Sequence, residues 1–389
     1  MVLDTIVGPA CGALMHATGR FPSGAVLDVR VLVLGDDHTA GQHQHQQQHP
    51  NRHHHQADAG STVHDLLERA AEAAESNSQC VDVYIETPAV DRANVYPVPG
   101  TIARLNEWLL PCLSSGSRRA PGQRGARCPL DPRRVRVHAF DSRATQADAD
   151  LNRTIKQRGD SRDPFGKDGW PPGAHVAYFG FLTGLGREPS SFGPALVRFL
   201  GNSVVLAQRW LDVHAVLSRR VRRRARLMPP GDVQHLLRAS YESLTSSSRS
   251  TTWGVMLAAA ADVYLMLRML APYDSRPQRP ADACGAPRHC VVYAGVWHAA
   301  NILRTLGVLA HGDAGAAPTA DMRMTAPDRV RLVDIPIVSA DLQVWVCDSL
   351  GDLVDQLLAS DAQSQRRDPF RLGFRTTRVH HTTLARMTQ

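Results

Sequence analysis

The chain has 389 residues, of which 43% are hydrophobic, and its net charge is +7 at pH 7. This apolar content is ordinary for a globular protein that buries a real core, and the positive charge allows an anionic partner without demanding one. The seven cysteines include no C-x-x-C pair, which argues against a cysteine zinc finger and a disulfide framework and favours a reducing, intracellular compartment.

Strands and helices alternate in the first part of the chain, after an N-terminal extension at residues 1–25. A β-branched run at 26–34 predicts a strand. The stretch at 39–60 is rich in His and Gln and predicts a disordered loop. A helical period that follows a Ser or Thr cap predicts a helix at 63–74. The next elements expected from their apolar patterns are strands at 80–86 and 133–141 and a helix at 101–110.

A helical block at 193–271 interrupts this alternation. Its most apolar part, at 253–271, is broken by Asp262 and Arg268, so we expect a buried helix and no membrane span. Strand–helix alternation on both sides of the block predicts an α/β fold with a parallel or mixed central sheet flanked by helices. The later elements expected are strands at 290–294 and 342–346, helices at 298–309 and 349–360, and a basic tail at 361–389, which leaves one α/β domain over 26–360.

Two strands of this pattern end in the same motif, Gly-x-x-His. Gly35 precedes His38 in VLVLGDDH, and Gly295 precedes His298 in VVYAGVWH. With 29 glycines and 18 histidines, about one match arises by chance, but both matches follow apolar strands. Glycine permits a tight turn at a strand end, and ligands of α/β sheets bind beyond the carboxyl ends of the strands.

Polar residues follow the other strand ends as well. Asp36 and Asp37 precede the first histidine, Glu86 ends the second strand, and Asp141 and Arg143 follow the third. Imidazoles and carboxylates are ligands for Zn²⁺, Mn²⁺, Co²⁺ or Fe²⁺. Without a metal, the same groups suit a histidine general base that a carboxylate orients, with an arginine that holds an anionic substrate.

The pair VLVLGDDH and VVYAGVWH, with VYIE between them, resembles the superfamily of erythromycin esterases, ChaN-type haem-binding proteins and TraB/Tiki proteins, and also uncharacterised proteins of giant DNA viruses. The resemblance implies duplicated strand–Gly-x-x-His–helix halves, a hydrolase that cleaves an ester or an amide of a small molecule or peptide, and, for a viral protein, the host cytoplasm or the virion. It implies His38, Glu86 and His298 as metal ligands, as in the Tiki-type metalloproteases. As in the esterases, one histidine would instead activate water, with Glu86 orienting it and Arg143 neutralising negative charge.

Other interpretations stay open. A structural ion pair is the expected role of Asp262 and Arg268 in their apolar helix, and support of the site by Asp262 is the alternative. A catalytically inactive viral scaffold or binding protein could have the same fold. The arginine run at 218–227 could touch phosphates, although the absence of interleaved aromatic residues disfavours nucleic-acid binding.

Overall fold

The computed structural model describes residues 4–6, 9–36, 61–88, 101–113, 128–141, 174–184, 204–245, 253–272, 284–311, 344–347, 354–355, 357–358 and 375–377. The loop expected to be disordered at 39–60 lies outside these residues, as does most of the tail at 361–389.

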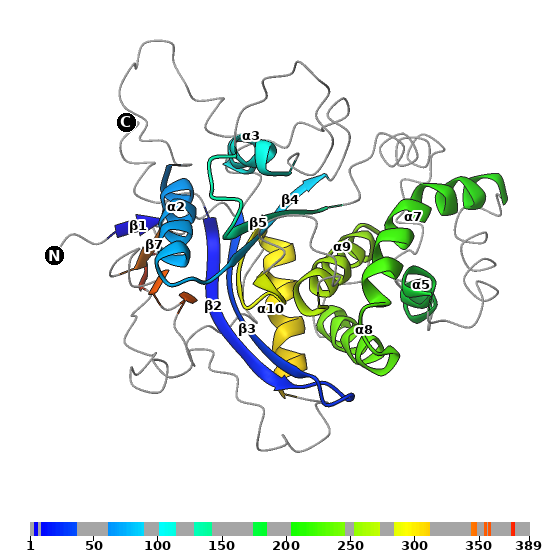
Figure 1. Cartoon of the computed structure of the whole chain (residues 1–389). Coiled ribbons are helices and arrows are strands. Elements are labelled where there is room, and N and C mark those ends of the chain that lie inside the picture. The colour runs from blue at the N-terminus through cyan, green and yellow to red at the C-terminus, as the bar shows by residue number, and fades with distance from the viewer. Residues whose placement is uncertain are drawn as a thin grey trace, which may run out of the picture.

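A five-stranded mixed sheet forms the centre of the molecule (Figure 1). Its strands are β2 (Pro9–Arg20), β3 (Val26–Asp36), β4 (Val81–Pro88), β5 (Val135–Asp141) and β6 (His289–Gly295). They lie in the order β2-β3-β6-β4-β5. The last four of these run parallel to one another, and β2 is antiparallel to β3 at one edge. The predicted α/β class with a mixed sheet is therefore confirmed.

The edge strand β2 comes from residues that the sequence analysis assigns to an N-terminal extension. It forms a hairpin with β3 through a turn in which Gly24, at φ +86°, donates its N–H to the carbonyl of Phe21. Met15 and Ala17 of β2 are buried in the same core as alternate residues of β3. The sequence PACGALMHATGR has few β-branched residues, so pairing with a strongly β-forming neighbour, and not intrinsic propensity, makes it a strand.

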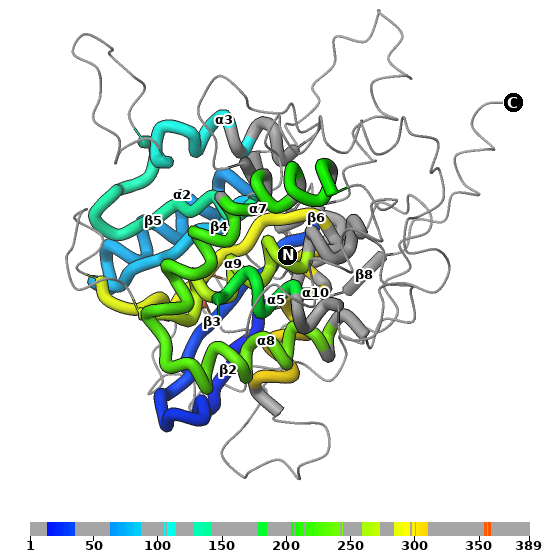
Figure 2. Tube along the Cα trace, turned by 90° about the vertical axis from the view of Figure 1, so that its right-hand side faces the viewer, coloured from blue at the N-terminus to red at the C-terminus, as the bar shows by residue number. Residues whose placement is uncertain are grey.

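Helices cover both faces of the sheet, as Figures 1 and 2 show. One core contains residues of α2 (Ser61–Ser76) and α3 (Thr101–Leu113). The opposite core contains residues of α5 (Ala174–Thr183), α7 (Val204–Ala225), α8 (Pro230–Thr245), α9 (Trp253–Leu270) and α10 (Val296–His311). The predicted helical block thus packs directly on the sheet. Among the described helices, none combines the length and the apolar character needed to cross a membrane.

The two faces of β4 differ in chemistry, because side chains alternate along a strand. Val83 and Ile85 face the core under α2 and α3. Tyr84 faces the opposite core, and by the same alternation Asp82 and Glu86 point to that side too. Buried polar groups are costly unless they are paired, so the helices over this face must supply partners for them.

A second, three-stranded antiparallel sheet lies beside the first. It consists of β1 (Asp4–Ile6), β7 (Val344–Cys347) and β8 (Arg375–Thr377), in the order β1-β7-β8. The strand expected at 342–346 is therefore present, but it pairs with the N-terminus instead of extending the central sheet. Of the helix expected at 349–360, the described residues Val354, Leu357 and Leu358 are buried in the core under α2 and α3.

Among the cysteines whose side chains the structure describes, four form two disulfides. Cys80 pairs with Cys284 and Cys112 with Cys128, while Cys290 is free and buried. The sequence argues against a disulfide framework, and these two pairs correct that expectation. Cys80 and Cys284 are 204 residues apart in sequence and come together just before the paired strands β4 and β6. Sequence spacing cannot reveal such a pair. The reducing compartment stays a prediction.

Candidate functional site

The carboxyl ends of the parallel strands meet at one edge of the central sheet. β3 and β6 are neighbours, and their register sets Gly35 beside Ala294 and Asp36 beside Gly295. The two strands that carry the Gly-x-x-His motifs therefore end side by side. β4 lies on the other side of β6, so its end at Glu86 reaches the same edge. This edge is the place where ligands bind in open α/β sheets.

His298 lies at this edge, in the first turn of α10, which begins directly after β6. Its side chain is only 5% exposed. The Nδ1 atom is 2.6 Å from Oδ1 of Asp262 on α9. The ring of Phe140, on β5, packs against the imidazole edge to face, with ring centroids 6.0 Å apart. The orientation of the imidazole is thus fixed by a carboxylate on one side and an aromatic ring on another.

Glu86 occupies the other side of the same imidazole. Its Oε2 accepts the backbone N–H of Gly295 at 2.5 Å, and its Oε1 is 3.4 Å from Nε2 of His298. The backbone hydrogen bond ties the end of β4 to the end of β6. A buried histidine therefore has a carboxylate facing each ring nitrogen, and the Nε2 side is the one that faces the strand-end residue.

A chain of hydrogen bonds continues from Asp262 into the helices. The second carboxylate oxygen, Oδ2, accepts from Nδ2 of Asn301 at 2.6 Å. Oδ1 of Asn301 in turn accepts from the hydroxyl of Ser243 on α8 at 2.9 Å. Asn301 is one helical turn beyond His298 on α10, so the two side chains share a face of that helix. All three residues are buried.

The preferred expectation for Asp262, an ion pair with Arg268, is wrong. Six residues on an α-helix correspond to about 120° of rotation and about 9 Å of rise, so the two side chains point in different directions. Asp262 reaches His298 and Asn301, while Nη2 of Arg268 is 2.5 Å from Nδ1 of His138 on β5. The alternative role for Asp262, support of the site, agrees with its position.

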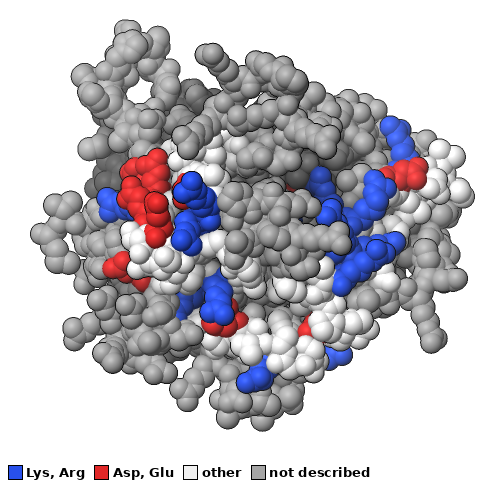
Figure 3. Space-filling view, viewed as in Figure 1, with Lys and Arg blue, Asp and Glu red and all other residues white. Residues whose placement is uncertain are grey.

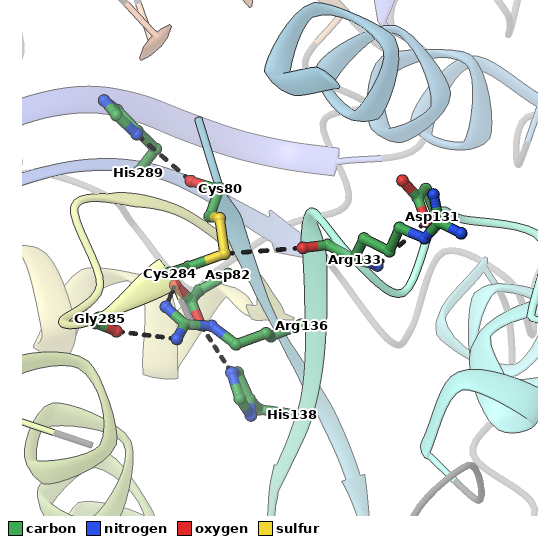
Figure 4. Close-up of a disulfide and its surroundings, with 9 residues drawn as sticks. All are labelled: Cys80, Asp82, Asp131, Arg133, Arg136, His138, Cys284, Gly285 and His289. Carbon is green, nitrogen blue, oxygen red and sulfur yellow. Dashed lines mark hydrogen bonds and ion pairs between the residues drawn. A yellow bond between two sulfur atoms is a disulfide. The ribbon is translucent and has the colours of Figure 1, made fainter. Parts of the chain in front are cut away.

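A second buried polar cluster lies on the same face of the sheet, further from the strand ends (Figure 4). Arg136 binds Asp82 through two hydrogen bonds, of 2.8 Å and 2.6 Å. Nε2 of His138 is 2.8 Å from the same carboxylate, and Arg136 also donates to the carbonyl of Gly285 at 2.8 Å. Asp82 is fully buried. Because the carboxylate needs a donor at Nε2 and Arg268 needs an acceptor at Nδ1, His138 is neutral with its proton on Nε2.

The environment shifts the pKa values of this cluster. Burial lowers the pKa of His138 to about 3, and the neighbouring Arg268 adds to that effect. Burial by itself raises the pKa of the Asp82 carboxyl, but the hydrogen bond from His138 and the charge and hydrogen bonds of Arg136 lower it overall. The cluster is therefore a neutral histidine and an ion pair locked between strands. The side-chain nitrogen and oxygen atoms of Asp82, Arg136 and His138 find their partners within the fold, which indicates a structural role.

The described residues provide two metal-ligand atoms at the strand edge. In a tetrahedral shell with bonds of about 2.1 Å, neighbouring ligand atoms lie about 3.4 Å apart, and the Nε2 atom of His298 and Oε1 of Glu86 have this separation. Asp262 is not a third ligand there, since it binds the opposite ring nitrogen. Within the described part of the chain no group of three His, Cys, Asp or Glu residues is arranged to hold a metal. A complete shell would need a ligand from elsewhere.

Two arginines of the run at 218–227 bind carbonyl groups inside the molecule. Figure 3 shows basic side chains over α7. However, Arg222 donates to the carbonyl of Phe181 at 2.7 Å, and the buried Arg224 donates to the carbonyl of Ala271 at 3.1 Å, just beyond the end of α9. Cations commonly bind the carbonyls at helix C-termini in this way. Arg219, Arg223 and Arg226 of the run are exposed, so part of it is used within the fold and part of it faces outward.

The structure describes little of the other predicted site residues. Residues Asp37, His38 and Arg143 lie outside the described part of the chain, and for Asp36 only the backbone is described. Asp141 ends β5 and is buried, opposite Pro88 in the register of β4 and β5.

Sequence reasoning missed several partners that the structure reveals. Asn301 lies three residues after His298, and this helical spacing could have indicated that the two side chains share a face of the helix. Polar residues at alternate positions of two apolar strands could have indicated the buried cluster in Figure 4. Nothing in the sequence marks Ser243.

A comparison with protein-family models, curated proteins and solved structures finds no match to the chain. The superfamily resemblance stays a prediction.

Proposed function

We propose that this protein is a hydrolase that cleaves an ester or an amide with a water molecule activated at Nε2 of His298. The observation that carries the proposal is the buried imidazole with a carboxylate facing each nitrogen, at the edge where the parallel strands end. A histidine that only caps its helix would need neither of the two acids.

The roles follow from the two sides of the ring. Asp262 accepts a hydrogen bond from Nδ1–H, which keeps that proton on Nδ1 and leaves the Nε2 lone pair to take a proton from water. Glu86 then stabilises the imidazolium and helps to orient the water, while its bond to Gly295 keeps it in place. The first turn of α10 adds the positive end of a helix dipole, which favours negative charge that develops in the transition state.

The same atoms would serve a metal-dependent version of the reaction. His298 and Glu86 would hold a divalent ion, with His38 as the further ligand that the superfamily resemblance implies. Such an ion lowers the pKa of a bound water, and so supplies hydroxide at neutral pH. A carboxylate on the far nitrogen of a metal-binding histidine is the usual arrangement, and Asp262 is placed for it.

The test compares His298, just after the carboxyl end of β6, with His289 at the start of that strand. His298→Ala removes the proposed base, and His289→Ala removes a half-buried histidine at the other end of the same strand. Each protein is assayed against p-nitrophenyl esters and chromogenic amides, with and without added Zn²⁺, Mn²⁺, Co²⁺ or Fe²⁺. The proposal predicts hydrolysis that falls by about 10²- to 10⁴-fold in His298→Ala and persists in His289→Ala. Equal activity of the two variants would contradict it.

Metal content separates the two versions of the chemistry. The histidine-rich stretch at 42–56 is deleted first, because it would bind metal non-specifically. One tightly held ion per chain, lost in His298→Ala, would assign the metal-dependent version. Activity that survives a chelator in a metal-free protein would assign the histidine base. A protein that neither hydrolyses any ester or amide nor holds a metal would be the binding scaffold instead.

A further inference from the structure

The helices over the sheet contribute directly to the environment of His298. Asp262 comes from α9 and Ser243 from α8, and both belong to the block that interrupts the strand–helix alternation. Together with Asn301 they form one continuous chain of hydrogen bonds that ends on the imidazole. This chain goes beyond the pair of groups needed for the proposed reaction.

We infer that Asp262 is a positioning residue, which holds the proton of His298 on Nδ1 and so sets the tautomer of the ring, and that Asn301 and Ser243 hold Asp262 in turn. The directions of the hydrogen bonds carry this inference. The Ser243 hydroxyl lies 2.9 Å from Oδ1 and 3.2 Å from the backbone carbonyl of Asn301, and it has one proton to donate to either oxygen. The ionised carboxylate of Asp262 can only accept, so Nδ2 of Asn301 donates to its Oδ2 and Nδ1–H of His298 donates to its Oδ1.

A purely structural interpretation makes a different prediction. Asp262 could merely join α9 to α10, and an asparagine of the same shape would serve that purpose about as well. A positioning carboxylate has to be an acceptor and has to be charged, since an amide could equally present N–H and so favour the wrong tautomer. The substitution Asp262→Asn therefore distinguishes the two roles. Partners of this kind typically change metal affinity or activity by about 10- to 100-fold.

Asp232 offers a matched control. It is as deeply buried as Asp262, it lies on α8, and both of its oxygens accept hydrogen bonds from Ser23, at 2.9 Å and 2.6 Å. Asp232→Asn is the same chemical change in a comparable setting without contact to the imidazole. Loss of stability common to both variants can thus be subtracted.

The experiment is nitrogen-15 NMR of the histidine rings in the full-length protein, with the His298 signals identified by their loss in His298→Gln. We expect Nδ1 of His298 to carry a proton in the wild type, to change its protonation or shift in Asp262→Asn, and to stay unchanged in Asp232→Asn. Asn301→Ala, a milder change, is expected to shift the same signals in the same direction. An unprotonated Nδ1 in the wild type, or ring signals that are the same in Asp262→Asn and wild type, would overturn the inference.

Only the kinetic consequence rests on the proposed function. If the protein hydrolyses an ester or amide, its kcat should fall by about 10- to 100-fold in Asp262→Asn and remain within a factor of two or so in Asp232→Asn. If it shows no hydrolysis, the proposed function fails while the NMR measurement still decides whether Asp262 sets the tautomer. An active Asp262→Asn variant with wild-type kcat would overturn the positioning role alone.

Discussion

Replacement of His138 by Gln should remove a pH-dependent part of the free energy of unfolding. Burial, reinforced by Arg268, lowers the pKa of His138 to about 3 from the ordinary 6.5. As the pH falls below 6.5, the unfolded chain takes up a proton at this residue, but the folded chain does so only near pH 3, so acid favours unfolding in that window. One pKa unit corresponds to about 1.4 kcal/mol, and the folded state should therefore lose about 3 kcal/mol between pH 7 and pH 4 from this residue.

Glutamine can still donate to Asp82 and accept from Arg268, yet it does not titrate. Urea unfolding of both proteins, followed by tryptophan fluorescence at four pH values from 7 to 4, measures the difference. We expect the wild type to lose about 3 kcal/mol more than His138→Gln over this range. Parallel pH profiles of the two proteins would show that the folded protein protonates His138 as easily as the unfolded chain does, and would refute the reasoning.

Three further predictions concern the parts of the fold that hold the site. Asp82→Asn leaves Arg136 buried without its counter-charge and should cost about 3–5 kcal/mol of unfolding free energy. Asp28→Asn, at a half-exposed pair with His16, should cost less than about 1 kcal/mol. Similar losses in the two variants would show that the buried pair contributes no more than the half-exposed one. Arg224→Ala should lower the free energy of unfolding by about 1.5–3 kcal/mol, because it loses the hydrogen bonds at the end of α9. Arg223→Ala, at an exposed position, should change it by no more than about 0.5 kcal/mol. A larger loss in Arg223→Ala than in Arg224→Ala would count against the inward-facing role of Arg224. The double variant Cys80→Ala/Cys284→Ala should lose about 2–4 kcal/mol, and peptide mapping without reductant should find these two cysteines linked; free thiols at both positions would contradict the pairing.

Much of the central sheet could be predicted because its strands have strong local signals. The runs VLDVRVLVL and HCVVYAG are apolar and rich in β-branched residues, and each ends at a glycine or just before one. The sequence therefore predicts both strands and the points where they end. β2 had no such signal, since it becomes a strand only by pairing with β3. The partner of β7 could not be inferred either, because β1 is more than 330 residues away in sequence.

The residues of the candidate site also differ in how far the sequence alone could predict them. Glu86 and His298 were predictable because each follows a strand whose end is visible in the sequence. Asp262 was ambiguous, since an acid in an apolar helix needs a partner but the sequence does not say which one. The contact with His298 depends on how α9 and α10 pack, and this long-range geometry has no local signature. The buried pair of Asp82 and Arg136 was missed for the same reason, although both residues occupy inward-facing strand positions.

The most direct test of the proposed hydrolase is the kcat/KM of Glu86→Gln on the best ester or amide substrate of the wild type. Glutamine keeps the shape of the side chain and can still accept the N–H of Gly295, so the fold should be preserved and the thermal midpoint should stay close to that of the wild type. Only the charge opposite Nε2 of His298 is removed. We predict that kcat/KM falls by about 10²-fold or more. Wild-type kcat/KM in a folded Glu86→Gln protein would contradict a catalytic centre at His298 and Glu86.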